Sequence, residues 1–266
     1  MKDALGDRMK DFYEDRTRYK LTRRTNTIIR IDGKSFHTYT KGLKKPFDDG
    51  LIEDMNLTTE FLCQNIQGCK FGYVQSDEIS LLLTDYDDIS TDAWFDGNIQ
   101  KMASIAASLA TAKFNQLRMS RSTWEGYDIP GYLDQDDIDD FKLAMFDARV
   151  FQIPHHEEVA NYFIWRQQDA TRNSISSVAQ AYFSPKQLHG VKTHQMQDML
   201  MLEKAINWND FSPREKRGSV IRKVEKEMSK NVKGEVITFT RNVWETDQET
   251  PIFTQDKDYL FKMFVK

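Results

Sequence analysis

The hydrophobic residues of this chain concentrate in two short runs, and each run meets acidic residues. Residues 28–31 are mostly isoleucine and lead directly into Asp32, while the run 73–83 is interrupted by Asp77 and Glu78. Short runs that are rich in β-branched, aromatic and large aliphatic residues favour strands over helices. We therefore predict two buried strands, each of which delivers a carboxylate to a turn.

Outside these runs, the spacing of apolar residues is mostly that of helices. This periodicity predicts helices at 3–19, 51–66, 98–117, 157–182 and 193–205, and a short helix that begins at Pro185. Strands are expected at 143–153, 218–224 and 236–244, the last two joined by a charged turn at 225–234. Residues 118–131 and 206–216 are expected to form loops, 134–140 an acidic surface run, and the last residues a peripheral segment.

The composition limits the class of protein. The chain has 266 residues, enough for a substantial core, and its net charge of −4 gives no overall positive field for nucleic acid. An RNA partner therefore requires a local basic cluster. Cys63 and Cys69 are too few for a zinc site and indicate ordinary thiols. The charged N-terminus is not a signal peptide and no apolar run spans a membrane, so we expect a cytoplasmic protein.

The acidic strand ends suggest metal chemistry. Asp32 and Asp77 offer hard carboxylate oxygens, which are the ligands that Mg²⁺ takes together with water and substrate phosphates. Two such ions stabilise the attacking and leaving oxygens of a phosphoryl transfer. The polar turn 34–37, which follows Gly33, has backbone N–H groups suited to a phosphate. From the pattern alone, a solvated hairpin turn and an ordinary Asp-Gly turn explain these residues equally well.

Three basic features have both a functional and an ordinary explanation. Lys101 lies near the start of a predicted helix, where the helix dipole disfavours cations. It therefore either binds an anion, such as a triphosphate, or extends past the sheet into solvent. Arg166, Asp169 and Asn173 share one helical face, which is either an exposed ion-paired surface or a face for nucleic acid or triphosphate. The basic segment 20–24 either holds phosphates or is a solvated charge run.

Six motifs occur in an order that resembles the tRNA-histidine guanylyltransferase family. They are IIRIDGKSFH from Ile28, KKPFD from Lys44, YVQSDEIS from Tyr73, WFDGNIQKMASIAAS from Trp94, FDARVFQIP from Phe146 and WRQQDATRNS from Trp165. The resemblance covers about residues 5–220 and implies an α+β fold similar to a polymerase palm. Such a fold is an antiparallel sheet packed on helices, with additional helices in the C-terminal half. It further implies one catalytic domain over 1–266, with a core at about 5–153 and an extension of helices and strands at about 154–266.

The same resemblance implies a nucleotidyltransferase that adds nucleotides in the 3′-to-5′ direction. In this reaction ATP activates the 5′-monophosphate of a tRNA, the 3′-hydroxyl of an incoming triphosphate such as GTP attacks the activated end, and AMP leaves. Two Mg²⁺ ions and a homotetramer are also implied.

The family motifs also assign roles to individual residues. Asp32 and Asp77 match the metal carboxylates, the carbonyl of Gly33 matches a backbone metal ligand, and Glu78 matches a further catalytic acid. Matches to nucleotide-binding positions are Lys34, Ser35, Phe36, His37, Lys45, Asp48, Ser76 and Lys101. Candidate RNA contacts are Arg149, Arg166, Arg172 and Asn173.

The segment after Trp165 departs from the pattern of enzymes that add one guanosine to tRNA-histidine. Those enzymes carry His-Ile-Asn-Asn where this chain has Thr-Arg-Asn-Ser at 171–174. The chain is therefore more similar to the Thg1-like branch, which repairs truncated tRNA 5′ ends by copying the opposite strand. Gly97 and Asn98 stand where some members carry basic residues. A strict guanylyltransferase, a palm-type nucleotide cyclase and a non-catalytic RNA-binding module are the alternatives.

Overall fold

A single antiparallel sheet organises the molecule. The computed structural model describes residues 4–126, 142–232 and 235–265. Its six strands lie in the order β4-β1-β3-β2-β5-β6, and every neighbouring pair is antiparallel. They are β1 (Asn26–Gly33), β2 (Cys69–Gln75), β3 (Glu78–Leu83), β4 (Phe146–Ile153), β5 (Ser219–Val232) and β6 (Glu235–Asp247). The α+β class and the two predicted buried strands are confirmed.

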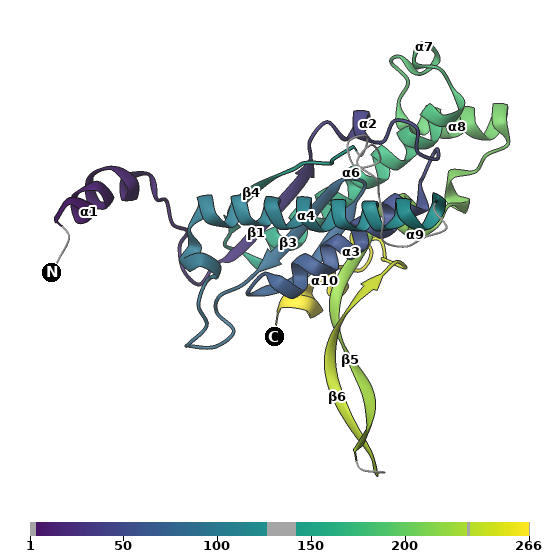
Figure 1. Ribbon diagram of the computed structural model, residues 1–266. Helices are drawn as coiled ribbons and strands as arrows, with labels where there is room; N and C mark the ends of the chain where they lie inside the picture. The colour runs from purple at the N-terminus through teal and green to yellow at the C-terminus, as the bar shows by residue number, and fades with distance from the viewer. Residues whose placement is uncertain (1–3, 127–141, 233–234, 266) are drawn as a thin grey trace.

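Two long helices cover one face of this sheet. They are α3 (Asp49–Asn65) and α4 (Ile99–Gly126), which run across the strands in Figure 1. Successive side chains of a strand point to opposite faces, and on β1 it is Ile29 and Ile31 that pack into the core beneath these helices. This core fixes the positions of β1, β2 and β3, whose ends carry the acidic residues.

The opposite face is covered by α6 (His156–Tyr182) and α10 (Lys257–Phe264). Ile28 of β1 belongs to this second core, together with Leu260 and Phe264 of α10. The last residues of the chain are therefore not peripheral, because apolar side chains spaced along α10 are buried against β2 and α6. By the same alternation, Arg30 and Asp32 lie on the α6 face of the sheet.

Additional helices gather around the second half of α6, as expected for the C-terminal half of the chain. They are α7 (Pro185–Leu188), α8 (Thr193–Lys204), the short turn η4 (Trp208–Asp210) and α9 (Pro213–Arg217). Val178 and Leu200 lie in a third apolar cluster that joins α6 to α8. The predicted loop at 206–216 is thus partly helical, because Ser212, Pro213 and Glu215 form a capping box with proline in the first turn.

The structure differs from the sequence expectations at three further places. Helical structure near the N-terminus runs through α1 (Ala4–Met9), η1 (Lys10–Glu14) and η2 (Asp15–Thr17), and it projects from the body with no buried residue (Figure 1). Helix α4 continues to Gly126, so the loop expected at 118–131 begins later; the rest of it and the acidic run 134–140 lie outside the described residues. Strand β5 includes most of the expected charged turn, because cross-strand pairs continue from Val220 to Val232.

Two short helical elements lie next to longer ones. The short helix α2 (Phe36–Tyr39) follows β1, and the turn η3 (Trp94–Gly97) precedes α4. Within the described ranges, no helix is both long and apolar enough to cross a membrane.

Candidate active site at the ends of β1 and β3

The acidic ends of the two predicted strands lie side by side. Asp32 of β1 is directly opposite Glu78 of β3, and the Gly33 N–H donates to the carbonyl of Asp77 at 3.1 Å. Ser76 and Asp77 form the two-residue turn between β2 and β3, in which Ser76 has a φ of 49°. The prediction that the two runs bring their carboxylates together is therefore confirmed by the strand register.

The turn after β1 is held by an aromatic side chain. A Cβ atom on Gly33 would lie 2.3 Å from the ring of Phe36, so only glycine fits beneath it. Phe36 is buried and packs against Phe114 and Phe146, with ring centroids 5.7 and 5.5 Å away. The buried Phe36 side chain fixes the turn, so only its backbone faces a nucleotide there, and the match of this turn to a triphosphate-binding turn stays a prediction.

The rest of the turn presents polar side chains to solvent. Lys34, Ser35 and His37 are exposed, and Ser35 has a φ of 53°. The Lys34 N–H already donates to the carbonyl of Met145 at 2.8 Å, so it is not available to a phosphate. Any phosphate at this turn must be bound by the remaining N–H groups and by the exposed side chains.

Glu78 is a buried, fully paired carboxylate. Arg166 of α6 donates to both of its oxygens, at 2.7 and 2.9 Å, and Arg30 Nε lies 3.0 Å from Oε2. Burial raises the pKa of Glu78, and the charges of Arg166 and Arg30 oppose that rise. Because the Arg166 side chain is 4% exposed and also binds Asp169, it is not a direct RNA contact, contrary to expectation.

Asp77 has a different environment from Glu78. Ser76 donates to its Oδ1 at 3.0 Å, but no cationic side chain in the described part of the chain forms an ion pair with it. Burial raises the pKa of Asp77, and the negative charge of Asp32 raises it further. The nearest cation to Asp32 is Arg30, at 3.5 Å. Two carboxylates with this little compensation suit a hard divalent cation.

A cation at this point needs ligands beyond side chains. No group of three or more histidine, cysteine, aspartate or glutamate side chains gathers into a metal site among the described residues. The carboxylate oxygens of Glu78 already interact with Arg166 and Arg30. The available donors are therefore the carboxylates of Asp32 and Asp77 and nearby backbone carbonyls, which leaves positions for water and substrate oxygens.

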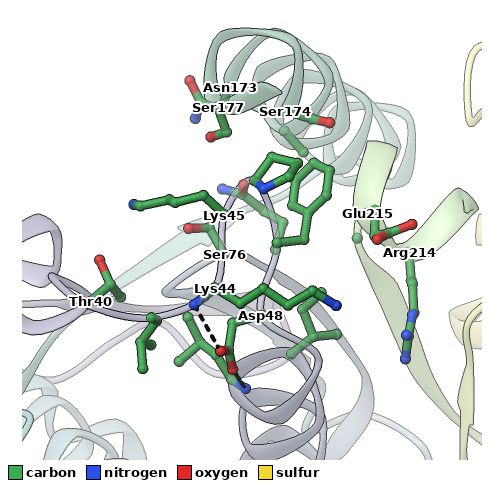
Figure 2. Close-up of a pocket in the computed structure, with 18 of the residues that line it drawn as sticks. Thr40, Lys44, Lys45, Asp48, Ser76, Asn173, Ser174, Ser177, Arg214 and Glu215 are labelled. Atoms are coloured by element: carbon green, nitrogen blue, oxygen red, sulfur yellow. Dashed lines mark hydrogen bonds between the residues drawn. The ribbon is translucent and has the colours of Figure 1, made fainter. Parts of the chain in front are cut away.

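A cavity of about 190 Å³ lies next to the hairpin turn that carries Ser76, and Figure 2 draws the side chains that line it. Figure 2 shows Asn173, Ser174 and Ser177 of α6 on one side, facing the loop that carries Lys44 and Lys45. The other lining side chains include Ser76, Asp48, Arg214 and Arg217. The structure thus brings together four predicted residues that are far apart in sequence, namely Lys45, Asp48, Ser76 and Asn173.

The loop on this cavity is shaped by Asp48. Its Oδ1 accepts from the N–H of Leu51 at 2.8 Å, which caps α3, and its Oδ2 accepts from the Lys44 N–H at 3.3 Å. Asp48 therefore has a structural role in presenting Lys44 and Lys45. A direct contact of Asp48 with nucleotide stays a prediction.

Sequence reasoning missed three basic residues of this cavity. Lys44 was passed over in favour of Lys45, and Arg214 and Arg217 lie in the segment expected to be a loop. The capping box formed by Ser212 and Glu215 was the available signal. It predicts the start of a short helix, and a helix holds the basic residues that follow in fixed positions.

Lys101 lies at the wrong end of the sheet for this site. Its N–H is capped by Asn98 at 3.0 Å, and Asn98 is bridged to Lys20, ahead of the start of β1. Phe114, thirteen residues further along α4, is the one that contacts Phe36. At 1.5 Å per residue, roughly 20 Å of helix separates Lys101 from the turn. Lys101 and the turn after β1 therefore do not meet on one triphosphate within one chain, and triphosphate binding by Lys101 stays a prediction.

The basic segment before β1 has found protein partners. Arg23 donates to Asp85 at 2.9 Å and to Asp92 at 3.2 Å, and Lys20 pairs with Asp96. These carboxylates belong to the loop after β3. The side chains of Lys20, Arg23 and Arg24 remain exposed, as expected for a solvated charge run, and their protein partners leave phosphate binding without support.

The remaining candidate RNA contacts differ in position. Arg149 is 59% exposed on β4, next to Asp147, which lies directly opposite Asp32 in the register. Arg172 is 52% exposed and donates to Asp169 at 2.8 Å, while Asn173 faces the cavity. Arg149 and Arg172 are accessible, and their role is still a prediction.

Comparisons with known proteins agree with the sequence motifs. The family model of tRNAHis guanylyltransferase, Thg1, matches residues 6–154. A bacterial tRNA(HIS) guanylyltransferase (Thg1)-like protein in complex with ATP is 46% identical, with a TM-score of 0.82 over 99% of this chain and 100% of that chain. In complex with GTP, such a protein is 44% identical, with a TM-score of 0.77 over 99% and 100%.

A more distant relative carries the family's activity in its name. The tRNA(His) guanylyltransferase of Eremothecium gossypii is 25% identical over 226 residues, which is 80% of this chain and 85% of that protein. The family model alone spans more than half of the chain. The chain therefore belongs to the tRNA(His) guanylyltransferase (Thg1) family, whose members are nucleotidyltransferases.

Proposed function

We propose that this enzyme adds nucleotides to the 5′ end of tRNA in the 3′-to-5′ direction, copying the opposite strand. The observation that carries the proposal is the Asp32 and Asp77 pair next to a cavity with four basic side chains. The bacterial Thg1-like structural relatives are in complex with ATP and with GTP, which supports a nucleotide in that cavity.

The reaction has two phosphoryl transfers. First, an oxygen of the RNA 5′-monophosphate attacks the α-phosphate of ATP, so that pyrophosphate leaves and the 5′ end carries AMP. Next, the 3′-hydroxyl of an incoming nucleoside triphosphate loses its proton to solvent and attacks the activated 5′-phosphate, and AMP leaves. Both steps depend on positioning and on balancing negative charge rather than on a covalent enzyme intermediate.

The side chains of the cavity suit these requirements. Lys44, Lys45, Arg214 and Arg217 would balance the charge of a triphosphate, and Ser76 is placed to donate to a phosphate oxygen. Asn173 would contact the sugar or the base from α6. Arg214 is partly engaged, because it donates to Asp49 at 2.6 Å.

The carboxylates would hold the metal. Asp32, Asp77 and the carbonyl of Gly33 fit Mg²⁺, since they are hard oxygen donors and Asp77 lacks a cationic partner within the described ranges. Two Mg²⁺ ions, when bound, would supply charge stabilisation to the attacking and leaving oxygens. Glu78 would act through Arg30 and Arg166, which fix the strand end, rather than as a metal ligand.

The finer choice within the family depends on residues 171–174. This segment of α6 has no histidine, and Asn173 and Ser174 line the cavity. The absence favours templated repair over addition of a single guanosine. The strict guanylyltransferase is the second candidate, because the family model and the Eremothecium relative carry that name. A homotetramer in the cytoplasm remains our expectation for the assembly and the location.

The proposal is tested by extension of a 5′-monophosphorylated tRNA that lacks its first nucleotides, with Mg²⁺, ATP and all four triphosphates. We expect ordered addition complementary to the opposite strand, and its loss in Asp32→Ala and Asp77→Ala. Asp198→Ala, which removes an exposed carboxylate on α8, is the matched control and should extend normally. A single guanosine added to intact tRNA-histidine, with truncated tRNAs left unchanged, would instead establish the strict guanylyltransferase.

A further inference from the structure

A second groove lies on the other side of α6 from the 190 Å³ cavity, which the proposed function assigns to a nucleotide and which we call the nucleotide cavity. Its volume is about 460 Å³, and its walls come from α6, from the segment around η4, from the end of α9 and from residues 252–254. The side chains that matter here are Thr171, Arg172, Trp208, Asn209, Lys216 and Arg217. We call it the α6–α9 groove.

The walls of this groove carry positive charge without a carboxylate. Arg172, Lys216 and Arg217 all line it, and none of its described lining residues is Asp or Glu. Lys216 Nζ donates to the carbonyl of Asn209 at 2.6 Å and Arg217 Nε donates to the carbonyl of Thr250 at 2.7 Å. Neither side chain forms an ion pair with a described residue. Burial and the charge of Arg217 lower the pKa of Lys216, which an anion would reverse.

An aromatic ring is fixed beside these cations. The indole N–H of Trp208 donates to Ser174 Oγ at 3.0 Å, and Lys216 Nζ lies 5.6 Å from the ring centroid. Because Ser174 lines the nucleotide cavity, one hydrogen bond joins the two sites through α6. A cationic wall with an aromatic side chain is a common arrangement in proteins that bind single-stranded nucleic acid.

The groove is also linked to the acidic strand ends by ion pairs. Arg172 binds Asp169 at 2.8 Å, Asp169 binds Arg166 at 2.8 Å, and Arg166 binds Glu78 at 2.7 Å. Arg217 lines both the groove and the nucleotide cavity. A ligand that binds Arg172 therefore contacts a side chain three ion pairs away from the candidate active site.

We propose that the α6–α9 groove binds the phosphate backbone of the RNA whose 5′ end reacts in the nucleotide cavity. The proposal rests on the proposed function and adds to it where the RNA strand lies. Phosphate is the shared chemistry of RNA and of a free nucleotide. RNA is favoured because the proposed function assigns the triphosphate to Lys44, Lys45 and Arg214, which line the cavity on the far side of α6. Backbone phosphate contacts of this kind position a polynucleotide without reading its sequence.

The test separates RNA binding from nucleotide binding. The variants are Arg172→Gln, Lys216→Gln and the double variant, and Lys186→Gln on the exposed surface of α7 is the control with the same charge change. Binding of a 5′-monophosphorylated tRNA is measured by fluorescence anisotropy over a range of salt concentrations, with no reaction required. The Michaelis constant for ATP is measured in parallel at saturating RNA.

We expect the double variant to weaken tRNA binding about tenfold or more at low salt and to reduce the salt slope by about 1 to 2. The Michaelis constant for ATP should stay within about twofold of the original protein. Lys216→Arg, which keeps the charge, should retain binding and so exclude a purely structural effect.

Other results would overturn the proposal. A higher Michaelis constant for ATP with unchanged tRNA binding would assign the groove to a nucleotide. Equal tRNA binding by the double variant and by Lys186→Gln would mean that the groove binds no RNA. If the original protein binds tRNA but adds no nucleotides, the proposed function fails and the binding comparison still tests the groove.

Discussion

Carboxylates at the two ends of the sheet have opposite electrostatic environments. At the end where β1 begins, Asp85 is 6% exposed and its Oδ2 accepts from Arg23 Nε at 2.9 Å and from the Arg24 N–H at 3.0 Å. At the end where β1 finishes, Asp77 has no cationic partner among the described residues, and a second carboxylate, Asp32, raises its pKa further. Only the second arrangement leaves negative charge for a ligand to neutralise.

This difference separates acids that hold the fold from acids that bind something else. Glu78 lies at the end where β1 finishes, which carries the candidate active site and is called the active end below. Its environment nevertheless resembles that of Asp85, because Arg166 and Arg30 neutralise its charge. A carboxylate that raises the free energy of the folded protein persists where a bound cation offsets that cost. The comparison therefore predicts different responses when individual acids and their partners are removed.

The largest effect is expected from Asp77→Asn. Loss of the carboxylate should lower the rate of nucleotide addition by a thousandfold or more, about 4 kcal/mol in the activation barrier, because the metal loses a ligand. Stability without metal should not fall. The folded pKa of Asp77 lies above its ordinary value, so the folded protein binds more protons, and stability is lost as pH rises through that range. Asparagine removes this loss.

The measurement for Asp77→Asn is thermal unfolding in EDTA at pH 7, together with single-turnover addition in Mg²⁺. An unchanged or higher melting temperature with a lost reaction is the expected pair of results. A variant that unfolds at a lower temperature in EDTA would contradict the view that this charge is uncompensated.

Arg166→Met should be the most destabilising change at the active end. It leaves Glu78 buried with part of its charge unpaired, and breaking a buried pair in this way costs about 3–5 kcal/mol. The folded pKa of Glu78 should rise further, so the loss of stability should be larger at pH 8 than at pH 5. Urea unfolding at both pH values measures it, and Glu78→Gln in the same chain should restore part of the stability.

Asp85→Asn is the counterpart of Asp77→Asn at the opposite end of the sheet, where β1 begins. It should lower stability by about 1–3 kcal/mol, since Arg23 and the Arg24 N–H lose a charged acceptor. Nucleotide addition below the melting temperature should stay within about twofold. If addition is lost while the protein remains folded, the two ends would not be separate in function.

The strand ends could be predicted from the sequence because the signals are local. Isoleucine-rich and aromatic runs specify buried strands, and the two-residue turn at Ser76 and Asp77 fixes the hairpin register. Once β1 pairs with β3, Asp32 must lie opposite Glu78. The nucleotide cavity was only half predicted, since Arg214 and Arg217 reach it from a segment more than 160 residues along the chain from the loop of Lys45.

The errors have a common physical cause, which is that spacing along a helix does not fix its placement. The spacing of Arg166, Asp169 and Asn173 shows that they share a side of α6, but tertiary packing decides which of them is buried against the sheet. Likewise, the start of α4 could lie at either end of the sheet. Only the contacts of Asn98 and Phe114 decide its direction.

The smallest effect is expected from Lys101→Gln. Because Lys101 lies roughly 20 Å along α4 from the turn that holds Phe36, its charge cannot balance a triphosphate in the same chain. Its ammonium lies 5.9 Å from the ring centroid of Phe95, an interaction that contributes little at an exposed site. The rate of nucleotide addition and the Michaelis constant for ATP should therefore each change by less than about twofold, or about 0.4 kcal/mol. A tenfold loss would mean that Lys101 acts on a nucleotide bound elsewhere, and mixing Lys101→Gln with Asp77→Asn protein would then reveal it: recovered activity in the mixture requires that the two residues serve one site from different chains.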